Sequence, residues 1–119
     1  MTKIDYLVVS HTEPDHAGSV ERLLELSPQM KILATGCAIG FLKEIVNRDF
    51  TAIAVKDNQT MEIGGKTLRF MVVPNLHWPD TMYTFIEEEQ ILVTCDSFGA
   101  HYCLPEVVSG QITAEEDHR

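Results

Sequence analysis

The first half of the chain alternates continuous apolar runs with segments whose apolar residues recur every three or four positions. The apolar runs at 4–9, 31–35 and 51–55 contain β-branched residues and are typical of buried strands. Residues 20–24 and 38–46 place their apolar side chains on one face of a helix and their charged side chains on the other. Strands joined through helices pair in parallel with right-handed crossovers. The pattern therefore predicts a parallel strand–helix–strand–helix–strand unit.

The second half of the chain shows no helical period, and short apolar strands follow one another at close spacing. Gly64–Gly65 and Glu88–Glu89 fall between such strands and are typical of hairpin turns. Strands joined by hairpins are antiparallel neighbours. The expected strands are 60–63, 68–73, 82–87 and 91–94. The chain contains no repeat or linker, so we expect a single domain over residues 1–119.

The chain has 119 residues, a length that suits one domain with its own core. Its 18 acidic and 9 basic residues give a formal net charge of -9, which disfavours nucleic acid and anionic membrane surfaces as partners. No apolar run is long enough for a signal peptide or a membrane span, so we expect a cytoplasmic protein. The three cysteines form no CxxC pair, and buried free thiols are their expected state.

Four potential metal ligands stand together in the hexapeptide 11–16, directly after the first predicted strand. The segment reads His11–Thr12–Glu13–Pro14–Asp15–His16. Loops at the carboxyl ends of strands are where α/β folds form their sites. In an extended loop alternate side chains point the same way, so His11, Glu13 and Asp15 converge and His16 turns in beside them. A polar surface loop is the plainer alternative, but this density of histidine and carboxylate favours a metal site.

Two further candidate ligands, His77 and Asp96, also follow predicted strands. A single histidine or aspartate in a loop is common. These two are candidate ligands because they share the strand-end position of the hexapeptide. Trp78, beside His77, either shields such a site from water or packs as a core aromatic. Cys95 is expected to point away from Asp96 and into the core, because successive strand residues face opposite sides.

These motifs together resemble the flavodiiron proteins. The pattern is histidine-x-glutamate-x-aspartate-histidine, then a histidine 62 residues beyond Asp15 (77 − 15), then an aspartate 19 further on (96 − 77). The stretches Leu76–His77–Trp78–Pro79–Asp80 and Asp96–Ser97–Phe98–Gly99–Ala100–His101 are similar to signature stretches of that family. The resemblance covers nearly the whole chain and implies an α/β fold. That fold is about half of a metallo-β-lactamase-like αββα domain, with a mixed sheet and two helices followed by antiparallel strands.

The resemblance also implies a di-iron site. One iron would be held by three residues and the second by two, with an aspartate bridging the pair. In that order the residues are His11, Glu13 and His77; Asp15 and His16; and Asp96. His101 would line the pocket as a catalytic proton donor, or would lie outside it in a supporting or surface position.

In the flavodiiron family the ferrous pair reduces dioxygen to water or nitric oxide to nitrous oxide. The resemblance implies that electrons come from FMN in a flavodoxin-like domain of the partner subunit in a head-to-tail homodimer, or from a rubredoxin-type donor. The sequence contains no phosphate loop for FMN and no flavodoxin-like domain. It ends 23 residues after Asp96 (119 − 96), before the last histidine ligand of the family. We therefore expect a partial di-iron domain that has no turnover by itself.

Glu13 separates this interpretation from a zinc enzyme. The wider metallo-β-lactamase superfamily generally has histidine at this position and binds zinc for hydrolysis. A carboxylate makes the site harder and more anionic, which favours iron over zinc. The first alternative is a zinc-dependent hydrolase of the same superfamily, and the second is a non-catalytic di-iron module that senses oxygen.

Overall fold

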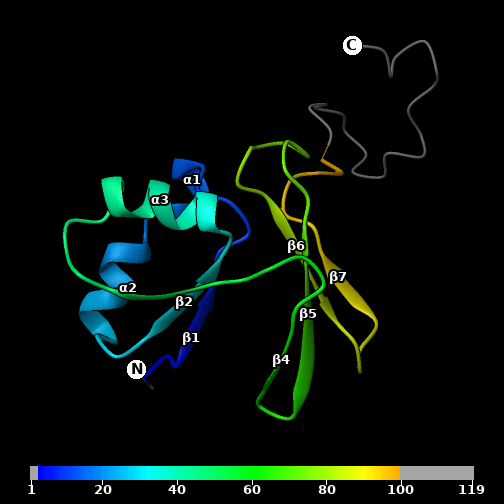
Figure 1. Ribbon diagram of the computed structural model, residues 1–119. Coiled ribbons are helices and arrows are strands. Elements are labelled where there is room, and N and C mark those ends of the chain that lie inside the picture. The colour runs from blue at the N-terminus through cyan, green and yellow to red at the C-terminus, as the bar shows by residue number, and fades with distance from the viewer. Residues whose placement is uncertain (1–2, 100–119) are drawn as a thin grey trace, which may run out of the picture.

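The computed structural model describes residues 3–99, which form three layers: helices, a parallel sheet and an antiparallel sheet (Figure 1). The helices are α1 (Pro14–Ala17), α2 (Val20–Leu26) and α3 (Gly36–Ile45). The parallel sheet consists of β1 (Tyr6–Val8), β2 (Lys31–Ala34) and β3 (Thr51–Ala54). The antiparallel sheet consists of β4 (Thr60–Ile63), β5 (Lys66–Val72), β6 (Met82–Ile86) and β7 (Ile91–Val93).

The strands of the parallel sheet lie in the order β1–β2–β3 and pair in parallel, as the sequence predicted. Their side chains alternate between two cores, because successive residues of a strand face opposite sides. On β2, Ile32 and Ala34 pack with the helices, whereas Leu33 packs toward the antiparallel sheet. The sheet is therefore buried on both faces, which explains why its strands read as continuous apolar runs.

Helix α3 covers the parallel sheet with only part of its predicted apolar face. Ala38 and Leu42 lie one helical turn apart and are fully buried. Phe41 and Ile45, which the periodicity assigned to the same face, are 36% and 47% exposed. A helix contacts a sheet along a narrow stripe, so residues beside that stripe stay accessible. The Thr35 hydroxyl caps the helix by accepting a hydrogen bond from the Ala38 N–H at 3.1 Å.

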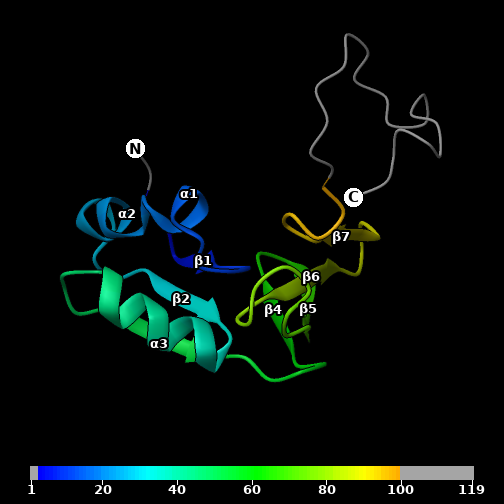
Figure 2. The same ribbon diagram turned by 90° about the horizontal axis from the view of Figure 1, so that it is seen from above.

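The strands of the antiparallel sheet lie in the order β4–β5–β6–β7, as the hairpin turns predicted. Gly64 and Gly65 close the first hairpin with φ angles of 61° and 79°, which glycine adopts without steric cost. Phe70 and Met82 of this sheet share a core with Leu33 of the parallel sheet, and all three are fully buried. This second core lies between the two sheets and packs one against the other. Figure 2 shows the two sheets from above.

Helix α1 corrects the prediction of an extended loop over residues 11–16. Glu13 is still extended, with φ −56° and ψ 135°, but a helical turn begins at Pro14. Proline suits a first helical position because its ring fixes φ and it has no N–H to leave unpaired. The backbone N–H groups of His16 and Ala17 both donate to the Glu13 carbonyl at 2.9 Å. The side chains of the hexapeptide therefore converge through a turn and not through strand alternation alone.

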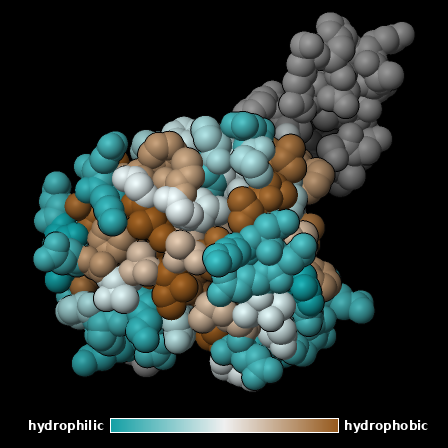
Figure 3. Space-filling model, viewed as in Figure 1, coloured by the Kyte–Doolittle hydropathy of each residue, from teal (hydrophilic) through white to brown (hydrophobic). Residues whose placement is uncertain are grey.

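The outer strand β7 exposes its three apolar residues, Ile91, Leu92 and Val93. Figure 3 shows hydrophobic residues at the surface of this view, interspersed with hydrophilic ones. Within residues 3–99 the helices pack on the parallel sheet only, so the described layers are α, β and β. This order agrees with the predicted partial αββα fold. The described helices are all too short or too polar to cross a membrane.

Candidate metal centre

Three loops at one end of the two sheets bring the predicted ligands together. They are the segment after β1, the loop between β5 and β6, and the segment after β7, all at the top of Figure 1. The ligand atoms fall into groups whose members lie within 4.8 Å of one another. The groups are His11, Glu13, His77 and Asp96; Glu13, Asp15 and His16; and His11, His16, Cys95 and Asp96. The predicted pocket residue His101 lies outside the described residues.

His11 is the most buried member of the cluster, with 2% of its surface exposed. The carbonyl of the preceding residue, Ser10, accepts a hydrogen bond from the Met82 N–H at 2.9 Å, which anchors the loop to β6. His11 Nε2 lies 3.1 Å from Glu13 Oε2 and 3.6 Å from Asp96 Oδ2. An imidazole nitrogen that faces two carboxylate oxygens is well suited to share a cation with them.

His77 joins this group from the loop between β5 and β6. Its Nε2 lies 2.9 Å from Glu13 Oε2 and 3.8 Å from Asp96 Oδ2. The backbone of His77 has a φ of 95°, a conformation that is unfavourable for any residue with a Cβ. Strain of this kind persists where the surroundings impose it, and it is concentrated at functional sites. His77 adopts it where its imidazole meets the two carboxylates.

Asp96 connects the two groups of ligands. Its Oδ2 lies 2.7 Å from His16 Nε2, and the same oxygen faces the imidazoles of His11 and His77. Asp15 Oδ1 lies 3.6 Å from His16 Nε2, on the more exposed side of the cluster. One carboxylate oxygen therefore faces three imidazoles, an arrangement that suits a carboxylate shared by two cations.

Hydrogen bonds between the ligands shift their ionisation. The hydrogen bond with His77, and then that with His11, lowers the pKa of Glu13 below its ordinary value of 4.5. The hydrogen bond with Glu13 raises the pKa of His77 above its ordinary value of 6.5. Glu13 is therefore negatively charged at neutral pH, as a cation-binding carboxylate must be.

The spacing of these atoms fits metal coordination. Two ligands that each lie about 2.1 Å from one ion are about 3.0 Å apart at a right angle and about 3.4 Å apart at a tetrahedral angle. The contacts among the nitrogens of His11 and His77 and the oxygens of Glu13 and Asp96 span 2.9 to 3.8 Å. Imidazole nitrogens combined with carboxylate oxygens suit iron and other first-row transition metals. The donor set therefore fits a transition-metal centre.

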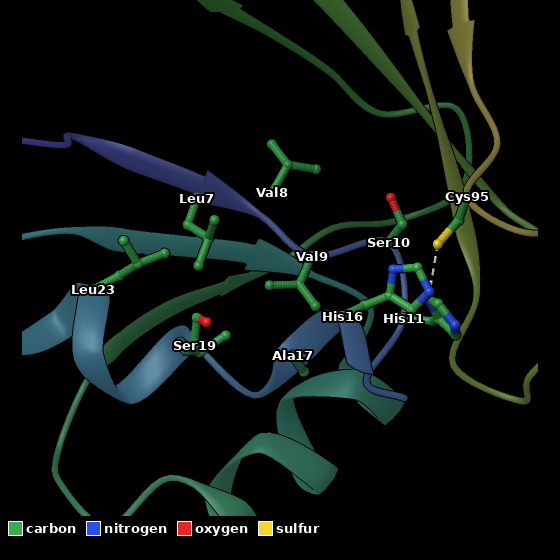
Figure 4. A pocket seen from close by; sticks show the side chains of 11 residues that line it. Leu7, Val8, Val9, Ser10, His11, His16, Ala17, Ser19, Leu23 and Cys95 are labelled. Carbon is green, nitrogen blue, oxygen red and sulfur yellow. Dashed lines mark hydrogen bonds between the residues drawn. The ribbon is translucent and has the colours of Figure 1, made fainter. Parts of the chain in front are cut away.

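Cys95 belongs to the site, although the sequence placed it in the core. Its Sγ lies 3.0 Å from His11 Nδ1, the ring nitrogen not directed at Glu13 (Figure 4). Cys95 has a φ of 55°, so strand alternation does not continue through it. Burial raises the pKa of its thiol, which stays protonated at neutral pH. A partner at Nδ1 leaves Nε2 of His11 available to a metal. Cys37 was also expected to be buried, but it is exposed.

A mainly apolar pocket of about 200 Å³ borders the site (Figure 4). Side chains of β1 and α2, including Leu7 and Leu23, line it together with the two histidines of the hexapeptide. The Trp78 ring lies edge-on to the His11 ring, with 5.9 Å between their centroids. Apolar neighbours lower the local dielectric constant and strengthen the electrostatic attraction between ligands and a cation.

Comparison with known proteins assigns the chain to a family. A family model described as "ODP family beta lactamase" matches residues 1–117. The chain belongs to the ODP family. It is 46% identical over 114 residues to the Flavo-diiron protein FprA2 of Clostridium acetobutylicum. The matched segment covers 94% of this chain and 28% of that protein. It is also 43% identical over 100 residues to a Nitric oxide reductase of Moorella thermoacetica, covering 83% of this chain and 25% of that protein.

Solved structures support the same assignment to the ODP family. The rubredoxin oxygen:oxidoreductase of Desulfovibrio gigas matches with a TM-score of 0.77 and 33% identity, over 94% of this chain and 28% of that one. The resemblance to flavodiiron proteins is therefore confirmed, and so is the metallo-β-lactamase-like fold. The chain spans between 25% and 28% of the length of these three relatives.

Proposed function

We propose that this chain provides the main ligand set of a flavodiiron-type di-iron domain, an oxidoreductase that reduces dioxygen to water or nitric oxide to nitrous oxide. The observation that carries the proposal is the position of Asp96 Oδ2, which faces His11 and His77 on one side and His16 on the other. A single-metal site does not need a carboxylate between two groups of ligands. A pair of metals does, because the shared carboxylate holds the two ions close together.

Each predicted ligand then has a defined task. One iron would be held by His11, Glu13 and His77 and the other by Asp15 and His16, with Asp96 shared between them. This division follows the resemblance to flavodiiron proteins, and the ligand atoms concerned lie in groups within 4.8 Å of one another. When bound, two ferrous ions supply electrons and Lewis acidity to a reducible diatomic substrate. We also propose that His101 donates protons, on the sole basis of its place in the signature stretch.

The protein residues around the ligands orient them. The Cys95 sulfur at His11 Nδ1 favours one orientation of the ring, with Nε2 directed at Glu13 and Asp96. His11 contacts the edge-on Trp78 ring and also lines the pocket beside β1 and α2. Glu13 supplies a hard anionic ligand, which favours iron over zinc in the first site.

We further propose the partners that this chemistry requires. The electrons would come from FMN in a flavodoxin-like domain, supplied by the partner subunit of a head-to-tail homodimer or by a rubredoxin-type donor. The proposal rests on similarity to relatives named as a flavo-diiron protein and a rubredoxin oxygen:oxidoreductase. The free thiols Cys37 and Cys95 suit a reducing compartment, so we assign the chain to the cytoplasm.

The decisive experiment counts metals on the full chain after anaerobic loading with ferrous iron and removal of excess metal. We expect close to two irons per chain, with a Mössbauer spectrum that reveals magnetic coupling between them after oxidation. Asp96→Ala should abolish the coupling, whereas Asp49→Ala, at an exposed aspartate just before the start of β3, should preserve it. Binding of zinc alone would favour a hydrolase, and binding of no metal would overturn the proposal.

A further inference from the structure

A buried carboxylate outside the ligand set joins the two ligand loops. Asp80 is 0% exposed and is not among the predicted metal ligands. Its Oδ2 accepts a hydrogen bond from the Thr12 N–H at 2.8 Å and another from the Thr12 hydroxyl at 2.6 Å. Both donors belong to the same residue, 68 positions away in the chain. One oxygen atom therefore fixes both the backbone and the side chain of Thr12.

Thr12 lies between the candidate ligands His11 and Glu13, so its position governs theirs. The backbone of the preceding Ser10 is held from the same side, because its carbonyl accepts from the Met82 N–H at 2.9 Å. The ligand loop is thus attached at alternate residues to the segment that begins β6. Two hydrogen bonds that meet at one buried oxygen are strengthened by the low local dielectric constant, so this attachment is stiff.

The other end of the connection leads to His77, which precedes Asp80 by three residues. The intervening turn is closed by Thr81, whose Oγ1 contacts both the N–H of Trp78 at 3.0 Å and its carbonyl at 2.7 Å. The carbonyl of Asp80 itself accepts a hydrogen bond from the Thr35 hydroxyl at 3.0 Å. Asp80 therefore belongs to a turn that is fixed internally and tied to the start of α3.

The second oxygen of Asp80 indicates what this residue contributes. Among the residues that the structure describes, Oδ1 is buried and has no hydrogen-bond partner. The described hydrogen bonds of the Asp80 side chain are therefore concentrated at Oδ2. What Asp80 supplies is the pair of hydrogen bonds at Oδ2, directed at the ligand loop.

We infer that Asp80 is a positioning residue that sets the separation between His77 and the pair His11 and Glu13. The role rests on the proposed metal centre, because it acts through ligands of that centre. Nitrogen and oxygen ligands bind a metal ion only within a few tenths of an ångström of their preferred distance. A loop that can slip relative to its partner loop loses affinity even when every ligand remains present. Asp80 and Thr12 prevent that slip.

The test compares Thr12→Val with Thr12→Ser on the full chain. Valine has nearly the shape of threonine but cannot donate the side-chain hydrogen bond, whereas serine retains the hydroxyl. The matched control is Thr84→Val, because the Thr84 hydroxyl is buried and has no partner within residues 3–99. The probe is Co²⁺ alone, titrated while its visible absorption and the metal-free unfolding temperature are recorded.

We expect Thr12→Val to weaken Co²⁺ binding roughly tenfold, the lower end of the range for residues that support metal ligands. Thr12→Ser should restore most of the affinity, and Thr84→Val should leave it unchanged. Asp80→Ala should weaken binding further. Adding Thr12→Val to Asp80→Ala should have no additional effect, because both changes remove the same hydrogen bond.

The possible outcomes separate this inference from the proposed function. If the wild type binds Co²⁺ and both Thr12→Val and Asp80→Ala bind it equally well, Asp80 has no positioning role and the metal centre stands. Equal losses in Thr12→Val and Thr84→Val would also overturn the role, because they would reflect general destabilisation. Absence of Co²⁺ binding by the wild type would overturn the metal centre and this inference together.

Discussion

Glu13 Oε2 lies 2.9 Å from His77 Nε2, although 64 residues separate the two positions in the chain. The same oxygen lies 3.1 Å from His11 Nε2. One carboxylate therefore links the loop after the parallel strand β1 to the loop that follows the antiparallel strand β5. Because the hydrogen bond depends on ionisation, the pair makes the metal-free chain sensitive to pH.

The sign of this sensitivity follows from the two pKa shifts. The pKa of His77 is raised above 6.5 mainly by its hydrogen bond with Glu13, so its contribution to stability is complete below 6.5 and is lost as the pH rises through the raised value. The pKa of Glu13 is lowered below 4.5 mainly by its hydrogen bond with His77, so its contribution is complete above 4.5 and is lost as the pH falls through the lowered value. Both contributions are present between pH 4.5 and 6.5.

We predict that Glu13→Gln lowers the pKa of His77 toward its ordinary value. The glutamine removes the negative charge and the acceptor that stabilise the imidazolium. Titration of the metal-free chain by NMR, following the His77 ring protons, measures the change directly. The urea midpoints of wild type and Glu13→Gln should differ more at pH 5.5 than at pH 8. An unchanged pKa of His77 in the variant would show that the two side chains do not interact in solution.

The variants His11→Ala and His16→Ala should differ in the amount of iron that each chain binds. His11 is buried and faces Glu13 and Asp96, whereas the more exposed His16 contacts Asp96 from the other group. We expect His11→Ala to reduce bound iron to less than one per chain and His16→Ala to leave about one, since only the second site loses a ligand. Elemental analysis after anaerobic loading provides the count. Equal losses would contradict the division into two sites.

Much of the fold was predictable because its patterns are local. The alternation of Ile32 and Leu33 between two cores is the period of a strand, and the hairpin at Gly64–Gly65 follows from the turn preference of glycine. Helix α1 was missed because four residues give no helical period. The exposed side chains Phe41 and Ile45 show the limit of periodicity, which predicts an apolar face but not how much of it is covered.

The candidate ligands were predictable for a different reason. Histidine and carboxylate at successive strand ends form a pattern in the sequence itself, and the resemblance to flavodiiron proteins added the expected partners. The residues that support the ligands leave no such trace. The hydrogen bonds between Thr12 and Asp80 join positions far apart in the chain. Cys95 was assigned to the core by strand alternation, but β7 ends at Val93 and the φ of 55° at Cys95 turns its side chain into the site.

Cys95 should react with alkylating agents more slowly than Cys37. Cys37 is exposed, whereas burial raises the pKa of the Cys95 thiol and reduces the fraction of reactive thiolate at neutral pH. Iodoacetamide treatment of the metal-free chain at pH 7.5, followed by peptide mass spectrometry, gives the modified fraction at each position. His11→Ala removes the ring beside the Cys95 sulfur and should accelerate its modification. Faster modification of Cys95 than of Cys37 in the wild type would be inconsistent with a partly buried thiol of raised pKa.

The core between the two sheets should matter for stability and, through it, for the ligand geometry. Phe70 is fully buried in this core, and its loss leaves a cavity that the sheets fill only in part. We expect Phe70→Ala to lower the free energy of unfolding by about 3–5 kcal/mol in urea denaturation. The control Leu92→Ala, at a residue 42% exposed on β7, should change it by less than about 0.5 kcal/mol.

The same pair of variants tests whether the core or the loops alone hold the ligands in register. His11 and Glu13 follow the parallel strand β1, whereas His77 follows the antiparallel strand β5, so the inter-sheet core determines the distance between their strands. Phe70→Ala should therefore weaken Co²⁺ binding under conditions where the variant is still folded by circular dichroism, and Leu92→Ala should not. If folded Phe70→Ala binds Co²⁺ as tightly as the wild type, the hydrogen bonds of Thr12 and Asp80 hold the two loops together without help from the core.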